Sequence, residues 1–138
     1  MAEKILREYV GRDHVPPTKL RLYGIEVEYE NYRGTAHRPS PEWQIKDDGS
    51  LRNGGIEYVF RRPLAINSSH TAIDSLWEMA SSLRLKPSPR TGIHVHVNCL
   101  DYSLSQILDI LTNYVLMEPF LFAYVGPLRD ESILCVPW

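Results

Sequence analysis

Residues 22–30, LYGIEVEYE, alternate between two kinds of side chain. Successive residues of a β-strand point to opposite faces, so the pattern predicts a strand with one apolar face and one acidic face. The acidic face carries three carboxylates, spaced at steps of roughly 6–7 Å along the strand: Glu26, Glu28 and Glu30. Carboxylates this close raise one another's pKa unless a cation lies between them, and hard divalent ions such as Mg²⁺ suit oxygen ligands. This strand therefore predicts one wall of a metal site.

Two later segments show the same division into an apolar and a polar face. In a predicted strand at residues 56–61, three apolar side chains share one face and Glu57 lies on the other. At residues 91–99, TGIHVHVNC, three apolar residues alternate with three polar ones: His94, His96 and Asn98. Carboxylate oxygens combined with imidazole nitrogens suit Mg²⁺ or Mn²⁺. The shared pattern predicts that the polar sides of the three strands meet on one face of a sheet.

Two segments have the periodicity of helices. The first predicts a helix at residues 69–84, with Asn67 or Ser68 as its cap. Its apolar residues follow helical spacing: Ile73, Leu76, Trp77, Ala80 and Leu83. Ser103, with Gln106 three residues later, has the spacing of a capping box and predicts the start of a second, longer apolar helix.

These elements define the expected fold class. A short strand at residues 42–47 completes the predicted order β-β-β-α-β-α. Two of the three connections between strands are too short to hold a helix, which favours a mainly antiparallel sheet. Two amphipathic helices are enough to cover its apolar face. We therefore expect an α+β fold with helices on one face of the sheet and an open polar face as the floor of a site.

The composition is that of one soluble globular domain. The chain has 138 residues, of which 43% are hydrophobic and 23% charged, and its net charge of -2 gives no overall attraction to nucleic acid or to an anionic membrane. The most apolar run, residues 107–125, is interrupted by polar residues, so no membrane span is expected. The N-terminus is charged from its third residue and lacks an apolar segment, which predicts a cytoplasmic protein without a secretory signal.

Basic residues near the polar face could hold a phosphate or a substrate carboxylate: Lys46, Arg52, Arg61 and Arg62. Each of these patterns also has a purely structural explanation. The glutamates could form an ordinary solvated face, the two histidines could be structural residues with local partners, and the basic residues could be solvated surface charge. The sequence has no GxxxxGK[ST] loop and no GxGxxG motif, so nucleotide binding by a P-loop or a Rossmann crossover is not predicted.

Four short motifs, in order, resemble those of a known family: GIEVEYE at 24–30, DGSL at 48–51, GGIEYVFRRPL at 54–64 and TGIHVHVN at 91–98. Together they are similar to the carboxylate-amine ligases of the glutamine synthetase and glutamate-cysteine ligase superfamily, in particular the amidoligase group of bacteria and phages. The resemblance runs from about residue 22 to residue 138. It implies a partial amidoligase-like catalytic domain at residues 21–138. The residues before it carry charge, two prolines and little periodicity, which predicts an N-terminal arm at residues 1–20 or a short helix leading into the first strand.

The resemblance implies a reaction and a set of metal ligands. Members of the superfamily bind ATP and two or more Mg²⁺ or Mn²⁺ ions across an antiparallel sheet, phosphorylate a substrate carboxylate, and let an amine attack the acyl phosphate. By position, four residues resemble the metal ligands of the family: Glu26, Glu28, Glu57 and His94. His96 and Asn98 would face the phosphates or the substrate, and we group Arg62 with them as cofactor-binding. Glu30 has no counterpart and is expected to be a surface charge.

Three basic residues form the expected catalytic set: Lys46, Arg61 and Arg129. Arg129 resembles the start of an arginine-to-cysteine motif of the amidoligase group, with Cys135 close to the cysteine position. Chains of this family usually continue well beyond the point where this one stops, and add more strands to the sheet. The resemblance therefore implies a shortened chain, a fragment, or a half-site completed by another copy or by a complementing chain.

Three functions follow from these patterns. The first is an ATP-dependent ligase that joins a small-molecule or peptide carboxylate to an amine, with no role for nucleic acid or a membrane. The second is a non-catalytic remnant or interaction module of the same fold. The third is a metal-dependent hydrolase that uses His94 and His96 with a carboxylate, where the metal activates water and no nucleotide is needed.

Overall fold

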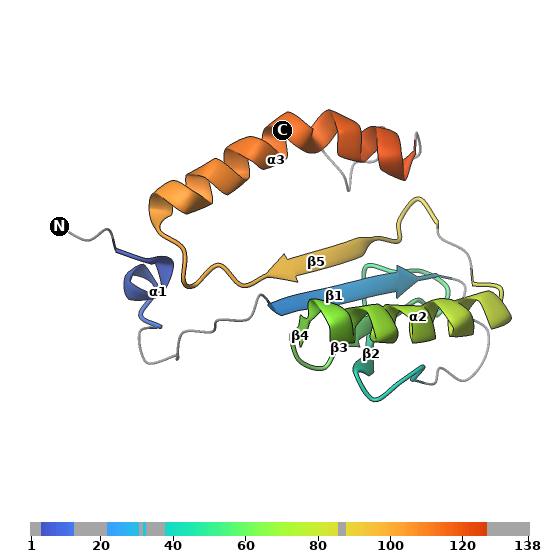
Figure 1. Ribbon diagram of the computed structural model, residues 1–138. Helices are drawn as coiled ribbons and strands as arrows, with labels where there is room; N and C mark the ends of the chain where they lie inside the picture. Colours follow the sequence, from blue (N-terminus) through green and yellow to red (C-terminus); the bar gives the residue numbers. More distant parts are fainter. Residues whose placement is uncertain (1–3, 13–21, 31, 33–37, 86–87, 127–138) are drawn as a thin grey trace. The chain divides into compact units, whose positions relative to one another are not determined.

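The computed structural model describes residues 4–12, 22–30, 32, 38–85 and 88–126. Within these residues the elements follow the order shown in Figure 1: α1 (Leu6–Tyr9), β1 (Leu22–Tyr29), β2 (Trp43–Asp47), β3 (Ile56–Phe60), β4 (Leu64–Ala65), α2 (Ile66–Ser82), β5 (Ile93–Val97) and α3 (Leu104–Val125). The chain divides into two compact units, which we describe separately. The first comprises Leu20–Val97; the second comprises Met1–Lys19 with Asn98–Trp138.

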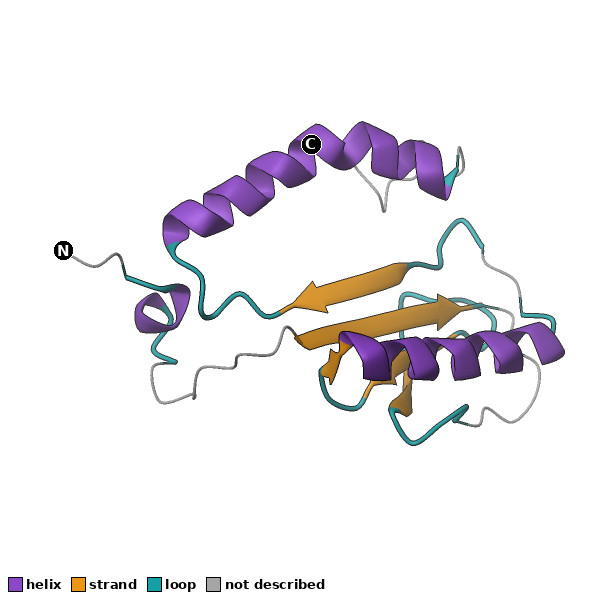
Figure 2. Ribbon diagram, in the orientation of Figure 1, coloured by secondary structure: helices purple, strands orange, loops and turns teal. Residues whose placement is uncertain are grey.

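The sheet lies within the Leu20–Val97 unit and all of its described pairings are antiparallel (Figure 2). Strand β1 is central: it pairs with β3 through residues such as Glu28 opposite Glu57, and with β5 through residues such as Glu26 opposite His94. Strand β2 lies beyond β3, with Lys46 opposite Glu57. Residues directly opposite one another point to the same face, so the register gathers the polar side chains of four strands on one side. The α+β class with a mainly antiparallel sheet is confirmed.

The apolar face of the sheet forms the core together with α2. Trp43 and Tyr58 are completely buried and pack edge to face, with ring centroids 6.5 Å apart. From α2, Ala72, Leu76 and Met79 join the same cluster, and the indole Nε1 of Trp43 donates a 2.8 Å hydrogen bond to the carbonyl of Ala72. This packing confirms that a helix covers the apolar face, and it leaves the polar face free of α2.

The start and the buried stripe of α2 differ from the sequence prediction. The helix begins at Ile66, three residues before the expected start, and its N-cap is Ala65, which makes no side-chain capping bond. The predicted cap at Asn67 or Ser68 is therefore wrong. The reason is β4, a two-residue strand that pairs with the start of β1 and leads directly into the helix. The predicted set of helically spaced apolar residues is also partly wrong as a buried face, because the side chain of Trp77 is 71% exposed.

In the second unit the N-terminal residues pair with the segment before α3. Ile5 forms an isolated β-bridge with Ser103, and Arg7 is buried and forms an ion pair with Asp101. Ser103 caps α3 as predicted: its hydroxyl accepts the N–H of Gln106, whose side chain accepts the N–H of Ser103. Residues 4–12 are thus hydrogen-bonded to the segment before α3, and α1 is the short helix that the sequence offered as one interpretation of the N-terminal residues.

Helix α3 is the one helix among the described residues that is long and apolar enough to cross a membrane. This finding rests on length and composition alone, and 6% of the most apolar window of the helix is buried within the described structure. Asp109 and Glu118 lie within the helix, and Glu118 is buried.

Candidate metal centre

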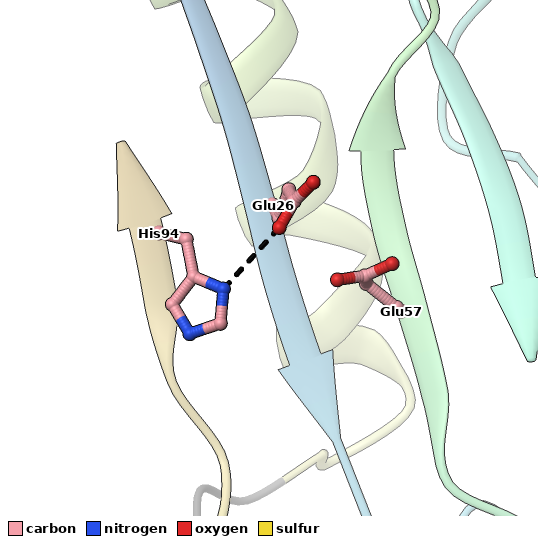
Figure 3. A group of neighbouring side chains, drawn as sticks. All are labelled: Glu26, Glu57 and His94. Atoms are coloured by element: carbon pink, nitrogen blue, oxygen red, sulfur yellow. Dashed lines mark hydrogen bonds and ion pairs between the residues drawn. The ribbon is translucent and has the colours of Figure 1, made fainter. Parts of the chain in front are cut away.

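Three neighbouring strands bring a first group of ligand-type side chains together. Glu26 from β1, Glu57 from β3 and His94 from β5 each offer a ligand atom, and these atoms lie within 4.8 Å of one another. We call them the histidine group. Figure 3 shows the three side chains on one face of the strands, with α2 behind the sheet. The group therefore occupies the open polar face, as the alternation of the sequence predicted.

Two imidazoles approach the same oxygen of Glu26. Its Oε2 lies 3.2 Å from Nδ1 of His94 and 3.3 Å from Nε2 of His96. Burial raises the pKa of Glu26, but the hydrogen bonds and positive charge of the two histidines outweigh it and lower this pKa below its usual value. Gly24 lies opposite His96, and a Cβ at this glycine would come within 3.3 Å of His96 Cβ. The two histidines thus favour the ionised form of Glu26.

A second group adds a carboxylate that the sequence analysis did not assign. The ligand atoms of Glu28, Asp48 and Glu57 also lie within 4.8 Å of one another, and we call them the aspartate group. Asp48 belongs to the turn after β2, where its Oδ1 accepts the N–H of Ser50 at 2.8 Å. This backbone hydrogen bond lowers the pKa of Asp48. A signal was present in the sequence, because Asp48 follows Lys46 by two residues and so continues the polar face of β2.

Glu28 is fixed by the backbone of a neighbouring loop. The carboxylate is 8% exposed, and its Oε2 accepts the N–H of Gly92 at 2.6 Å. Its Oε1 lies 3.9 Å from Nε2 of His94. A Cβ at Gly92 would lie 3.1 Å from Nε2 of His94 and 3.3 Å from Oε2 of Glu28, so a larger residue here would crowd both side chains. The close approach depends on a glycine at this position.

Glu57 belongs to both groups, so the negative charges of both act on its carboxylate. Burial raises its pKa, and the negative charges of Glu26 and Asp48 raise it further, while Lys46 acts in the opposite direction. Four carboxylates therefore lie close together, with two imidazoles and the ammonium of Lys46 nearby. Ligands on opposite sides of one Mg²⁺ are about 4 Å apart, so the ligand atoms of either group, which lie within 4.8 Å of one another, would draw together slightly around a cation. Carboxylates also cluster in proteins that bind no ion; the donor set fits Mg²⁺ or Mn²⁺ by its oxygen-rich chemistry.

The other residues expected at the site lie in different places. Lys46 is exposed on the polar face opposite Glu57. Arg61 and Arg62 follow the far end of β3, roughly 13 Å along the chain from Glu57, where the N–H of Arg61 bonds the carbonyl of Glu42. Asn98 belongs to the second unit, and its Oδ1 accepts the N–H of Leu100 at 3.0 Å.

Two remaining residues complete the comparison with the sequence. Arg129 lies outside the described residues. Glu30 was expected to be a surface charge, but it is 8% exposed and accepts hydrogen bonds from Arg52 and Ser88. Sequence alternation places Glu30 on the polar face, yet the loops that cover it come from distant parts of the chain. It belongs to neither ligand group.

Comparison of the chain with protein-family models, curated proteins and solved structures returned no match. The fold and the site alone therefore define the class of protein. It is an α+β domain with an antiparallel sheet, one face of which is covered by α2 while the other carries a dense set of carboxylates and histidines.

Proposed function

We propose that this domain is an ATP-dependent carboxylate-amine ligase that holds Mg²⁺ or Mn²⁺ on the polar face of its sheet. One observation carries the proposal: ligand-type side chains from three strands and a turn converge in two groups that share Glu57. The mixture of carboxylates with an imidazole in the first group, and the sharing of Glu57 by both, supports a pair of divalent ions over an ordinary solvated face. The ordered sequence motifs similar to the amidoligase group support the same function.

The histidine group would hold one divalent ion and the aspartate group a second, with Glu57 between them. When bound, such ions neutralise charge on the phosphate oxygens of ATP. The protein residues supply the position and the charge for this binding. The buried carboxylate of Glu28 is fixed by Gly92, and the ionised carboxylate of Glu26 is fixed by the two histidines. These contacts exist before any ligand binds, so little rearrangement is needed.

The reaction would proceed in two steps. An oxygen of the substrate carboxylate attacks the γ-phosphorus of ATP, ADP leaves, and an acyl phosphate forms. The nitrogen of the amine then attacks the acyl carbon, phosphate leaves and an amide bond forms. The exposed imidazole of His96 is close enough to the site to accept the proton that the amine loses, and the exposed ammonium of Lys46 can attract the phosphate oxygens.

The substrates would be a small-molecule or peptide carboxylate and an amine, and the reaction would take place in the cytoplasm. Of the basic residues predicted at the site, Lys46 is the one that the described part of the chain places opposite Glu57, and a nucleotide needs further positive charge. Arg129, a second copy of the chain or a complementing chain would supply it. Arg61 and Arg62 could serve only a part of the substrate that extends toward the far end of β3.

The test is phosphate release from ATP in the presence of Mg²⁺ and a pool of carboxylates and amines. We expect release that requires both substrates, is abolished in Glu57→Gln, and persists in the control Asp74→Asn, which changes an exposed carboxylate on α2. Equal activity in Glu57→Gln and the wild type would overturn the metal assignment. Absence of ATP binding by the folded chain would favour a non-catalytic module, and hydrolysis without ATP would favour a metal-dependent hydrolase.

A further inference from the structure

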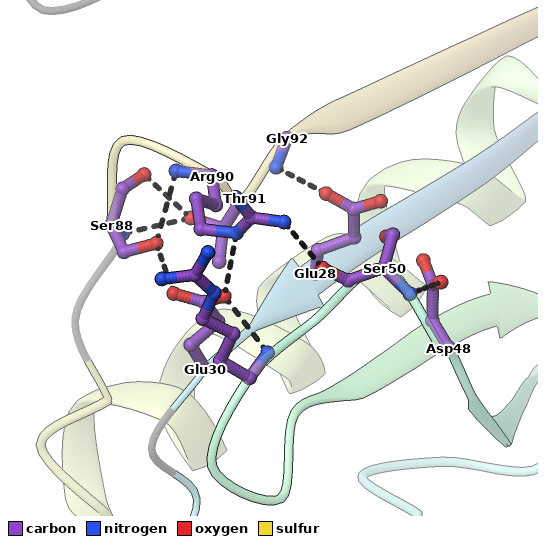
Figure 4. Close-up of polar contacts among 9 residues, drawn as sticks. Glu28, Glu30, Asp48, Ser50, Ser88, Arg90, Thr91 and Gly92 are labelled. Carbon is purple, nitrogen blue, oxygen red and sulfur yellow. Dashed lines mark hydrogen bonds and ion pairs between the residues drawn. The ribbon is translucent and has the colours of Figure 1, made fainter. Parts of the chain in front are cut away.

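The buried carboxylate of Glu30 connects three segments at the end of β1. Its Oε1 accepts the N–H of Arg52 at 2.9 Å, and its Oε2 accepts the hydroxyl of Ser88 at 2.7 Å. The Nε atom of Arg90 lies 3.5 Å from Oε1 (Figure 4). Each oxygen of this carboxylate thus has a partner on a loop, and the two loops are far apart in the sequence.

Arg90 extends the connection to the turn after β2. Its terminal guanidinium nitrogen donates a 2.8 Å hydrogen bond to the carbonyl of Ser50, and its backbone N–H donates to the hydroxyl of Ser88 at 3.1 Å. The guanidinium of Arg90 thus bonds the carbonyl of Ser50 and is in ion-pair range of Glu30, without a hydrogen bond from its Nε to any described residue. A planar guanidinium can serve both groups, whereas an ammonium is a single point of charge. Arg90 therefore links the loop before β5 to the turn that contains Ser50.

Both segments linked by Arg90 carry parts of the aspartate group. Ser50 donates its own N–H to Asp48, and Gly92, two residues after Arg90, donates its N–H to Glu28. The histidine group is different, because its three residues belong to strands paired with β1 or to β1 itself. The register of the sheet positions the histidine group. It also sets Glu28 opposite Glu57, but loop contacts hold the carboxylate of Glu28 and the turn that carries Asp48.

We propose that Glu30 and Arg90 are positioning residues for the divalent ion held by the aspartate group, and that the histidine group does not depend on them. This inference rests on the metal sites of the proposed function. The negative charges of Asp48 and Glu57 oppose each other, so a contact that holds the turn of Asp48 at the sheet favours binding of a cation between them. The bond from Arg90 to the carbonyl of Ser50 is such a contact.

The experiment is a titration with Mn²⁺ alone, followed by calorimetry and by electron paramagnetic resonance, well below the unfolding temperature of each variant. In the wild type we expect two bound ions with the magnetic coupling of a close pair. In Arg90→Met we expect the first ion to bind with unchanged affinity and the second to bind about 10–100-fold more weakly, the usual effect of removing a residue that orients metal ligands. Glu30→Gln is expected to weaken the same site.

Two further variants separate positioning from general stability. Arg84→Met changes an exposed arginine after α2 and is expected to leave both affinities unchanged. Arg90→Lys keeps the charge but cannot span Glu30 and Ser50 together, so we expect its second-site affinity to lie between those of Arg90→Met and the wild type. A purely structural pair would lower the unfolding temperature of the variants without changing the ratio of the two affinities.

The outcomes distinguish this inference from the function on which it rests. If the wild type binds two Mn²⁺ ions and Arg90→Met binds both with unchanged affinities, the positioning role is overturned and the metal sites stand. If Arg90→Met weakens both ions equally, the positioning role is likewise overturned. If the folded wild type binds no Mn²⁺, the metal sites fail and the positioning role fails with them.

Discussion

Glu26 and His94 are directly opposite each other on β1 and β5, and Nδ1 of His94 lies 3.2 Å from Oε2 of Glu26. This cross-strand pair fixes the orientation of the imidazole ring. With Nδ1 directed at Glu26, Nε2 lies on the side of Glu28, 3.9 Å from its Oε1. His94 thus stands between a carboxylate of the histidine group and a carboxylate of the aspartate group.

Replacing His94 should therefore weaken metal binding without unfolding the domain. The side chain is 53% exposed, so little packing is lost in His94→Ala. We expect the affinity for Mn²⁺ to fall at least about tenfold, because the replacement removes a ligand and releases Glu26. Calorimetric titration measures this change, with His70→Ala, an exposed residue of α2, as the matched control. Unchanged affinity in His94→Ala would contradict the assignment of this residue as a ligand.

Metal binding should weaken as the pH falls because Glu57 has a raised pKa. Protons compete with the metal for this carboxylate, and the competition begins at a higher pH than for an ordinary glutamate. In the metal-free protein, the contribution of Glu57 to the stability of the fold depends on pH in the opposite direction. A carboxyl group with a raised pKa in the folded state destabilises the fold where it is ionised, so its contribution improves as the pH falls through that value.

Glu57→Gln should remove both effects. Without metal, we expect this variant to be at least as stable as the wild type at neutral pH, because it relieves repulsion from Glu26 and Asp48. Thermal unfolding with a chelator present measures this difference, and calorimetry over a pH series measures the affinity. A less stable metal-free Glu57→Gln domain would show that the carboxylate is held by favourable contacts and that its charge is already balanced.

Glu30 should affect stability in the opposite direction from Glu57. The hydrogen bonds from Ser88 and Arg52, together with the charge of Arg90, lower the pKa of Glu30 below its ordinary value of 4.5. Because the pKa of Glu30 is lower in the folded state than in the unfolded state, its ionised carboxylate stabilises the fold at pH values above the unfolded-state pKa. This stabilisation is lost as the pH falls through the folded-state pKa. Glu30→Gln should be less stable than the wild type at neutral pH, and urea unfolding should show this difference shrinking in acid. A difference independent of pH would exclude the ionic contribution.

The main features of the fold and of the histidine group could be predicted from the sequence, because they depend on local periodicity. Alternation of apolar and polar residues assigns Glu26, Glu57 and His94 to one face, and antiparallel pairing then brings them together. The capping box at Ser103 likewise depends only on residues within one turn. Such signals need no knowledge of distant parts of the chain.

The features that escaped prediction depend on contacts between distant segments. Strand β4 has two residues, too few for a periodic pattern, and exists because it pairs with the start of β1. Asp48 belongs to a turn in which the carbonyl of Ser50 accepts a hydrogen bond from Arg90, and Glu30 is buried by loops that follow it by 22 and 58 residues. Periodicity gives the face of a side chain, whereas burial depends on what covers that face.

The two tryptophans Trp43 and Trp77 test the assignment of the core. Trp43 is completely buried, donates a hydrogen bond to Ala72 and packs 4.4 Å from the ring of Phe60, whereas Trp77 is 71% exposed. Trp43→Phe leaves a cavity and removes the indole hydrogen bond, while the carbonyl of Ala72 keeps the hydroxyl of Ser75 as a donor at 2.7 Å. We expect a loss of about 1–3 kcal/mol, mostly from the lost packing. Trp77→Phe should change the free energy of unfolding by no more than about 0.5 kcal/mol. Urea unfolding followed by circular dichroism compares the two variants directly, and equal losses would mean that Trp77 is buried in solution by a part of the protein that packs on α2.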